Sequence, residues 1–143
     1  WGELDYLILD LPPGTGDIQL TIVQTISLTG AVIVTTPQEV ALIDARKAIS
    51  MFDKVNVSIM GLVENMAWFE CEHGTRYPIF GEGGGAAEAK KLKLPLLGQI
   101  PINIPTREQG DAGTPVALID PAENDASAAF AALATSVDQI AQS

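Results

Sequence analysis

Two acidic residues near the start of the chain have the types and spacing of a metal and phosphate site. Asp10 directly follows an apolar run, Tyr6 to Leu9, and Asp17 comes after an intervening stretch with two prolines and two glycines. A carboxylate at the end of a buried strand can hold Mg²⁺ directly or through water. Gly14 and Gly16 allow the backbone to approach a ligand closely, so that loop N–H groups can contact a γ-phosphate. We therefore interpret Asp10 as a metal-facing acid and Asp17 as a residue that polarises water.

The same residues have a simpler interpretation, in which they only shape the connection between a strand and a helix. An acid at a strand end can accept hydrogen bonds from nearby N–H groups, and Asp17 or Thr15 can cap the next helix. Asp10 considered alone favours this interpretation. The whole combination of apolar run, Asp10, prolines, glycines and Asp17 favours nucleotide binding instead.

A sheet is needed to position these residues, and the pattern along the chain predicts one. Continuous apolar runs predict buried strands at 6–9, 31–34, 57–63 and 96–100, the last of them ended by Pro101. Apolar residues at helical spacing predict helices from Asp17 to before Gly30, over 38–54, in a short stretch through Lys93, and over about 123–141. Alternating strands and helices predict an α/β fold, with a mostly parallel sheet flanked by helices on both faces.

Polar residues follow the predicted strands, at the edge where such sheets bind ligands. They are Asp10, Gln38, Asn65 and Asn103. Without further information, turn formation at a strand end explains Asn65 best. Between Ala67 and Gly85 the chain is polar and rich in glycine, and we expect an excursion from the sheet there. Its glycine run from Gly81 lacks the Lys-Ser/Thr of a phosphate loop, so we interpret that run as a mobile turn.

Composition limits the classes of protein to which the chain can belong. Its 143 residues, 47% of them hydrophobic, suffice for the core of one domain. No apolar run reaches the roughly 18 residues of a membrane span, and a net charge of −10 disfavours nucleic acid as a partner. The single cysteine, Cys71, excludes an internal disulfide and suits a reducing, cytoplasmic setting. Because the chain starts at Trp1 and an apolar run follows at once, we expect a piece of a longer protein.

Several segments, in order, resemble the Mrp/ApbC family, deviant P-loop ATPases related to MinD and ParA that carry iron–sulfur clusters. The resemblance rests on LDYLILDLPPGTGDIQLT, AVIVTTPQEVALIDARKAISMF, GLVENMAWFEC and LGQIPINIPTREQGDAGTPV, and it runs from about Leu4 to Val116. It implies a partial, Rossmann-like P-loop NTPase fold, with residues 1–143 as the C-terminal part of a single ATPase domain. The family's phosphate loop would lie upstream, so we expect the chain alone to be inactive toward ATP.

The resemblance implies roles for the residues of the opening motif. Asp10 would be the Mg²⁺-associated acid of the Walker B strand. The residues from Leu11 to Asp17 would form the switch II loop, in which Pro13 and Gly14 would contact the nucleotide and Asp17 would take part in hydrolysis. The implied cofactors are ATP and Mg²⁺.

The resemblance also implies a base-binding side and partners. Asn65 would contact the adenine base, and Pro101 and Ile102 would lie near its ring. Asn103 stands where the family often has aspartate. The implied partners are a second copy of the chain, in a homodimer, and apo iron–sulfur proteins as recipients, with no nucleic acid and no membrane.

Cys71 is the implied metal ligand. Family members typically carry Cys-x-x-Cys here, so that four thiolates from two subunits hold a four-iron, four-sulfur cluster. In this sequence Gly74 stands three residues after Cys71, and two thiolates per dimer are too few for that cluster. Two Cys and two His, with His73 as the additional ligand, would suit zinc or a histidine-ligated cluster. An exposed hairpin that binds no metal is the other interpretation.

These inferences predict part of an ATP-binding and hydrolysing iron–sulfur cluster carrier, to which this chain supplies the Walker B, switch II and adenine-side residues. The alternative is a non-enzymatic dimerisation or partner-docking module built on a P-loop-derived scaffold. A ParA-like partition ATPase is less consistent with the sequence, which shows no basic or amphipathic segment for DNA or membrane.

Overall fold

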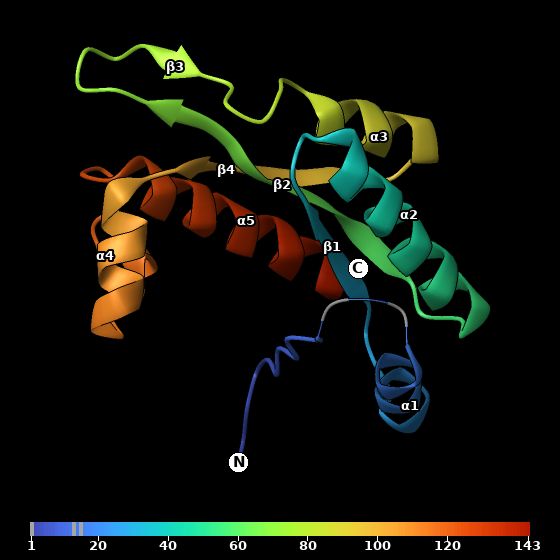
Figure 1. Cartoon of the computed structure of the whole chain (residues 1–143). Helices are drawn as coiled ribbons and strands as arrows, with labels where there is room; N and C mark the ends of the chain where they lie inside the picture. The colour runs from blue at the N-terminus through green and yellow to red at the C-terminus, as the bar shows by residue number, and fades with distance from the viewer. Residues whose placement is uncertain (1, 13, 15) are drawn as a thin grey trace.

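Strands and helices alternate along the chain, whose computed structural model describes residues 2–12, 14 and 16–143 (Figure 1). The strands are β1 (Ala31–Thr35), β2 (Ile59–Glu70), β3 (Arg76–Tyr77) and β4 (Leu96–Ile102). The helices are α1 (Asp17–Thr25), α2 (Glu39–Lys54), α3 (Gly84–Leu92), α4 (Ile104–Ala112) and α5 (Asp125–Ala141), with a short 3-10 turn at Val116–Leu118.

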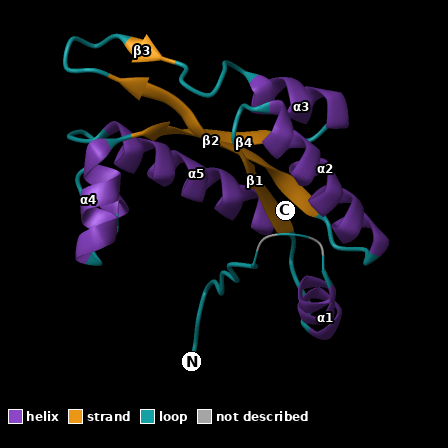
Figure 2. Ribbon diagram, in the orientation of Figure 1, coloured by secondary structure: helices purple, strands orange, loops and turns teal. Residues whose placement is uncertain are grey.

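β2 is the central strand of the sheet (Figure 2). β1 and β4 pair with it in parallel, and the two-residue β3 pairs antiparallel with its last residues. The predicted α/β class is therefore confirmed, with one antiparallel strand in an otherwise parallel sheet. Among the described residues, β1 has a neighbour on one side only, and Val34 on this strand is 60% exposed.

Helices cover both faces of the sheet, as predicted. On one face Phe52 of α2 packs in a cluster that includes Leu62 of β2 and residues of α1 and α3. On the other face Phe130 and Leu133 of α5 pack against Ile100 of β4. Both clusters combine a strand buried on its inner face with a helix whose apolar residues recur at helical spacing. In the described part of the chain, no helix is both long and apolar enough to cross a membrane.

The buried strand predicted at Tyr6 to Leu9 is wrong. This segment forms neither strand nor helix, and the side chain of Ile8 is 87% exposed. A buried parallel strand needs hydrogen-bonding neighbours and apolar cover on both faces. The segment instead lies outside the sheet (Figure 1), where the Tyr6 hydroxyl donates a hydrogen bond to Asp138 of α5.

Several predicted boundaries also differ from the structure. β2 continues to Glu70, through part of the segment that we expected to leave the sheet, because β3 returns and pairs with it. Pro101 lies inside β4 and does not end it. β4 pairs only with β2 among the described strands, and an edge strand tolerates a residue without an N–H group. The glycine run is not a free turn, because Gly84 and Gly85 form the first turn of α3.

α4 is a helix that the sequence interpretation missed. The side chain of Asn103 caps it by accepting a hydrogen bond from the backbone N–H of Thr106, at 3.1 Å, and Pro105 lies in its first turn. Asparagine at the cap followed by proline in the first turn is a recognisable start signal. The helix was overlooked because none of its residues is buried, so it has no apolar periodicity.

Candidate functional site

The carboxyl ends of β2 and β4 bring three predicted base-side residues together. Asn65 of β2 lies opposite Ile100 of β4. Pro101 and Ile102 are the next two residues of β4. Pro101 is buried, and Asn65 and Ile102 are half-buried. One amide side chain thus lies beside an apolar surface at the edge of the sheet where α/β proteins bind ligands. Such an edge can hold a flat ring by one polar contact and apolar packing.

The predicted phosphate-side residues lie elsewhere in this structure. Asp10, Gly14 and Asp17 are exposed and belong to the segment outside the sheet, away from the hairpin end of β2 (Figure 1). Gly14 has a φ of 99°, which favours glycine. Asp17 is the first residue of α1 and Gly16 is its N-cap residue, so the predicted capping role of Asp17 is wrong. Pro13 and Thr15 lie outside the described residues.

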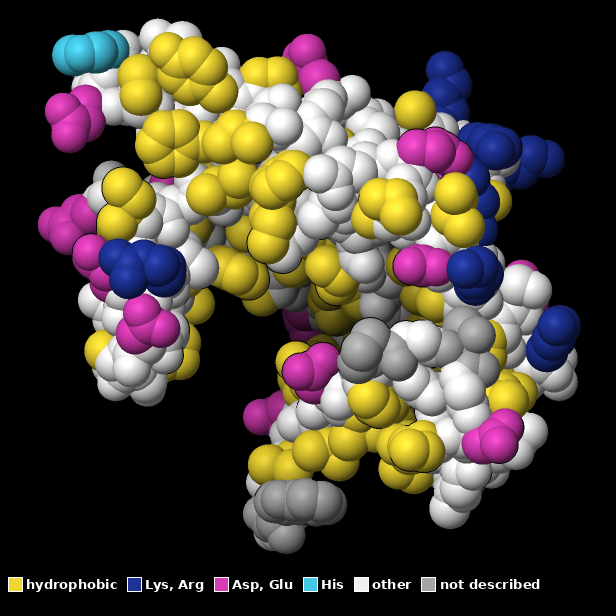
Figure 3. Space-filling model, viewed as in Figure 1, with side chains coloured by type: hydrophobic (Ala, Val, Ile, Leu, Met, Phe, Trp, Pro, Cys, Tyr) yellow, Lys and Arg dark blue, Asp and Glu magenta, His cyan; other side chains and the backbone are white. Residues whose placement is uncertain are grey.

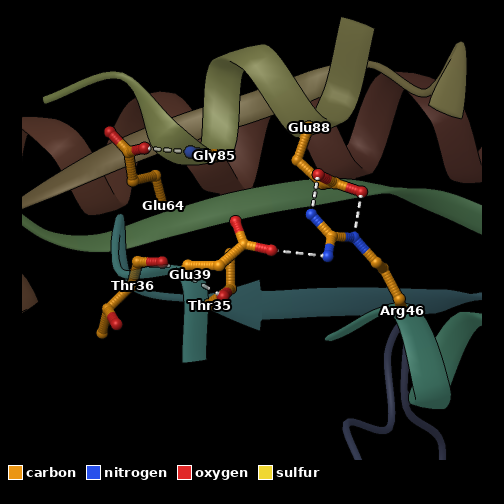
Figure 4. A network of polar contacts seen from close by, with 7 residues as sticks. All are labelled: Thr35, Thr36, Glu39, Arg46, Glu64, Gly85 and Glu88. Carbon is orange, nitrogen blue, oxygen red and sulfur yellow. Dashed lines mark hydrogen bonds and ion pairs between the residues drawn. The ribbon is translucent and has the colours of Figure 1, made fainter. Parts of the chain in front are cut away.

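Glu64, which the sequence interpretation missed, is a buried carboxylate next to Asn65. Its side chain is fully buried and accepts hydrogen bonds from the backbone N–H of Gly85 and from Nε2 of Gln99, the latter at 2.6 Å. Figure 4 shows the carboxylate directed at the first turn of α3, where the helix dipole favours a negative charge. Glu64 therefore joins β2, β4 and α3 at the edge that carries Asn65.

The Cys71 thiol lies in a closed turn between β2 and β3. The Cys71 N–H donates to the carbonyl of Thr75 at 3.0 Å, and the Gly74 N–H donates to the carbonyl of Cys71 at 2.9 Å. Hydrogen bonds from the backbone of His73 and Thr75 lower the pKa of Cys71. Among the described residues, no group of three or more His, Cys, Asp and Glu could hold a metal ion. The predicted pair of Cys71 and His73 is thus not a complete metal site within one chain.

A pocket lies between this hairpin and Ile102, one of the three base-side residues. Its volume is about 540 Å³, and its lining includes Cys71, His73, Ile102, Asn103 and Asp125. The amide of Asn103 donates to Asp125 while its oxygen caps α4, so this side chain is already used within the protein. Exposed apolar residues, Tyr77 and Ile79, continue the surface beyond the hairpin, where Figure 3 shows hydrophobic side chains gathered.

Sequence comparison identifies the relatives of this chain. A family model described as ParA, NUBPL iron-transfer P-loop NTPase, matches residues 1–138. The chain belongs to this iron-transfer P-loop NTPase family. It is 53% identical over 143 residues to the iron-sulfur cluster carrier protein of Deinococcus radiodurans, and 53% identical over 138 residues to that of Escherichia coli K12. The matches cover 98% and 96% of this chain, which spans 40% and 37% of those relatives.

Solved structures agree with this membership and with the fold. A nucleotide-binding protein from Archaeoglobus fulgidus, in complex with ADP, superimposes with a TM-score of 0.71 at 47% identity, over 79% of this chain and 47% of that one. MinD of Aquifex aeolicus superimposes with a TM-score of 0.72 over 96% of this chain and 55% of its own, at 20% identity. The MinD match shows the fold alone. The predicted resemblance is confirmed at the level of family and fold.

An ion-pair network holds α3 against α2, beside Glu64 (Figure 4). The Arg46 guanidinium binds both carboxylate oxygens of Glu88, at 2.7 and 2.6 Å, and reaches Glu39 at 2.8 Å. Glu88 is buried, and the guanidinium holds the pKa of that carboxyl below its usual value. A bidentate pair of this kind fixes the relative orientation of two helices.

We expect acidification to remove the contribution of this pair to stability. Because the folded-state pKa of Glu88 is lowered from 4.5, the stabilisation is fully present above pH 4.5 and is lost as the pH falls through the lowered pKa. Arg46→Met leaves a buried carboxylate unpaired, so the variant should be less stable at neutral pH. Its free energy of unfolding should also fall less between about pH 5 and about pH 2. Urea denaturation across that range measures both effects.

Lys47→Met is the matched control for this experiment. Lys47 pairs with Asp44 on the same helix, but their side chains are 62% and 74% exposed. The substitution should change the free energy of unfolding by less than about 0.5 kcal/mol at every pH. If Arg46→Met and wild type lose stability in parallel on acidification, the Arg46–Glu88 pair does not make the expected contribution.

Proposed function

We propose that this chain is part of an ATP-binding and hydrolysing iron–sulfur cluster carrier, and that it supplies the switch and base-side residues. The observation that carries the proposal is the 53% identity to cluster carrier proteins over almost the whole chain. The ADP complex of the Archaeoglobus relative supports nucleotide binding. Because the chain spans about 40% of the curated relatives, the activity belongs to the longer protein.

Asn65, Pro101 and Ile102 form the proposed base side. An asparagine side chain has two donors and two acceptor positions, and the bond that Asn65 Oδ1 accepts from the Met66 N–H uses only one of them. The amide can therefore donate to and accept from the edge of adenine. Half-buried Ile102, which follows buried Pro101 in β4, offers apolar area to the ring. We assign Asn65 the polar contact that selects the base.

Asp10 is the proposed Mg²⁺-associated acid, and Asp17, Pro13 and Gly14 belong to the proposed switch loop. An exposed carboxylate suits Mg²⁺, which prefers oxygen ligands and keeps several waters. When bound, the ion would neutralise charge on the phosphates. Asp10 would bind it or its water, and Asp17 would orient the attacking water.

The cargo of the proposed carrier is an iron–sulfur cluster, and Cys71 is its proposed ligand. The lowered thiol pKa supports this role, since the thiolate is the form that binds metal. One cysteine per chain supplies one thiolate, so further ligands must come from elsewhere. A second copy of the chain in a cytoplasmic homodimer, with His73 as a further ligand, is the arrangement that we propose. Apo iron–sulfur proteins would receive the cluster.

A hybrid protein tests the ATPase role. In it, this chain replaces the matching segment of the Deinococcus radiodurans relative, to which it is 53% identical. We expect the hybrid to hydrolyse ATP, and Asp10→Asn to lower kcat by about 100-fold because a charge contact to the metal is lost. The chain by itself should show no turnover. Steady-state phosphate release measures all three proteins.

Asp5→Asn is the control, because Asp5 is an exposed acid of the same segment with no proposed role. Turnover by the hybrid that survives Asp10→Asn would refute the Walker B assignment. A folded hybrid that forms dimers but hydrolyses no ATP would favour the partner-docking module instead.

A further inference from the structure

β2 contains an irregularity between the base-side edge and the Cys71 hairpin. From Asn65 to Phe69 this strand advances four residues, whereas β4 advances two, from Ile100 to Ile102. Pro101 lies opposite the irregularity and has no N–H to donate to β2. The extra residues form a bulge, and such bulges bend a strand. Beyond it, β2 continues away from β1 into the hairpin (Figure 1).

Met66, the first residue of this bulge, has an unusual backbone conformation. Its φ is 55°, in the left-handed region, which a residue with a side chain adopts at a cost in free energy. Its side chain is exposed and does not pack in either apolar core cluster. Its N–H donates to Oδ1 of Asn65 at 2.9 Å. Because this N–H lies in the peptide plane between Asn65 and Met66, the side chain of Asn65 fixes the orientation of the plane at which the bulge begins.

The residues beyond the bulge are tied to one another. The Arg76 guanidinium lies over the Trp68 ring, 4.7 Å from its centre, and its Nε is 2.7 Å from Glu70. β3 pairs with the last residues of β2, and the turn from Cys71 to Thr75 is closed by two backbone hydrogen bonds. Because of these contacts, the hairpin changes direction as a unit. The bulge in β2 is the point at which the hairpin connects to the rest of the sheet.

We propose that Asn65 is a positioning residue that sets the direction of the Cys71 hairpin by fixing the peptide plane between Asn65 and Met66, which stabilises the bulge despite the left-handed conformation of Met66. The hydrogen bond between Asn65 and Met66 is local. Its effect reaches Cys71 through the last residues of β2, which are tied to β3. The Cys71 side of the pocket thereby keeps its place opposite Ile102. This inference goes beyond the proposed function, because it concerns the apo chain and needs neither nucleotide nor metal.

The test uses the 143-residue chain with Trp1→Phe, which leaves Trp68 as the reporter of hairpin position. In Asn65→Ala, we expect the Met66 amide to exchange about fivefold faster with solvent, as expected for one lost hydrogen bond, whereas the Cys71 and Gly74 amides keep their rates because the turn moves as a unit. Trp68 emission should shift to longer wavelength, with stronger quenching by acrylamide. Asn65→Asp retains the acceptor oxygen and should behave as wild type.

A second substitution separates positioning from general stability. Glycine adopts a left-handed φ without cost, so Asn65→Ala combined with Met66→Gly should restore wild-type Trp68 emission. The amide of Leu62, in the core of β2, should exchange at the same rate in all variants. Asn103→Ala is the control at the same pocket, because it removes the α4 cap and does not touch the bulge.

Three results would overturn the proposal. They are unchanged Trp68 emission in Asn65→Ala, an equal emission shift in Asn65→Asp, and failure of Met66→Gly to restore wild-type emission in the double variant. If Asn65→Ala unfolds the chain, the double variant decides, since glycine at position 66 should restore both the fold and wild-type Trp68 emission. No measurement here involves ATP, so the outcome is independent of the ATPase result with the hybrid.

Discussion

Replacing Gly84 by alanine is expected to lower the free energy of unfolding by about 3 kcal/mol. A Cβ at this position would lie 2.1 Å from the carbonyl oxygen of Pro37 and 2.9 Å from its carbonyl carbon. Both are backbone atoms, so neither can move aside as a side-chain end can. The start of α3 would have to withdraw from the β1–α2 connection, and the bond from the Gly85 N–H to Glu64 would weaken. Chemical denaturation measures the loss, equivalent to roughly 10 °C in Tm.

Gly110→Ala is the matched control. Gly110 lies in α4, and nothing stands within 4 Å of the position that its Cβ would occupy. Alanine there should stabilise the protein by about 0.5–1 kcal/mol, because glycine loses more backbone freedom in a helix. If Gly84→Ala is as stable as wild type, α3 does not approach Pro37 as closely as the structure shows.

Glu64→Ala is expected to cost about 3 kcal/mol as well, for a different reason. The substitution leaves the buried N–H of Gly85 without its acceptor and the amide of Gln99 without its partner. Each buried polar group that loses its partner costs about 1–3 kcal/mol, and the lost side chain leaves a cavity. Because Glu64 lies next to Asn65, the same substitution should also loosen the base-side edge. Urea denaturation and amide exchange of Asn65 measure the two effects.

Glu64→Gln distinguishes the hydrogen bonds from the charge. Glutamine can accept from the Gly85 N–H, and Gln99 can turn its amide oxygen toward the new NH₂ group. We therefore expect a loss of about 1 kcal/mol, mainly from the weaker attraction to the positive end of α3. A loss as large as that of Glu64→Ala would show that the negative charge itself dominates.

The sequence predicts helices and strands well where their apolar residues pack against another helix or strand of the described chain. α2 and α5 have long periodic apolar faces, and the predicted contacts of Phe52 and Phe130 exist. The run at Tyr6 to Leu9 is as apolar as a strand, but apolarity indicates a tendency to be buried and does not supply neighbouring strands. α4 lacks a buried face, so only its cap at Asn103 could have revealed it.

The base-side residues were predictable, but the contacts that hold them were not. The rule that ligands bind at the carboxyl ends of parallel strands points to Asn65, but its role at the base, like that of Pro101, came only from the family resemblance. In the sequence, Glu64 is a single acid after an apolar run, with no sign that it is buried. Its hydrogen-bond partners Gly85 and Gln99 are 21 and 35 residues away in sequence, so their contact with it could not be predicted. The left-handed conformation of Met66 had no signal, since glycine or asparagine is the residue expected there.

Among the described strands, β1 pairs on one side only, and this affects how the chain behaves in solution. A strand with one neighbour presents a row of free backbone donors and acceptors, and exposed Val34 adds apolar surface beside them. A second molecule that adds its own strand there would be favoured at high concentration. Association of this kind stabilises the folded state by mass action, so unfolding midpoints would rise with protein concentration. The stability differences given above therefore apply at concentrations where the midpoint is constant.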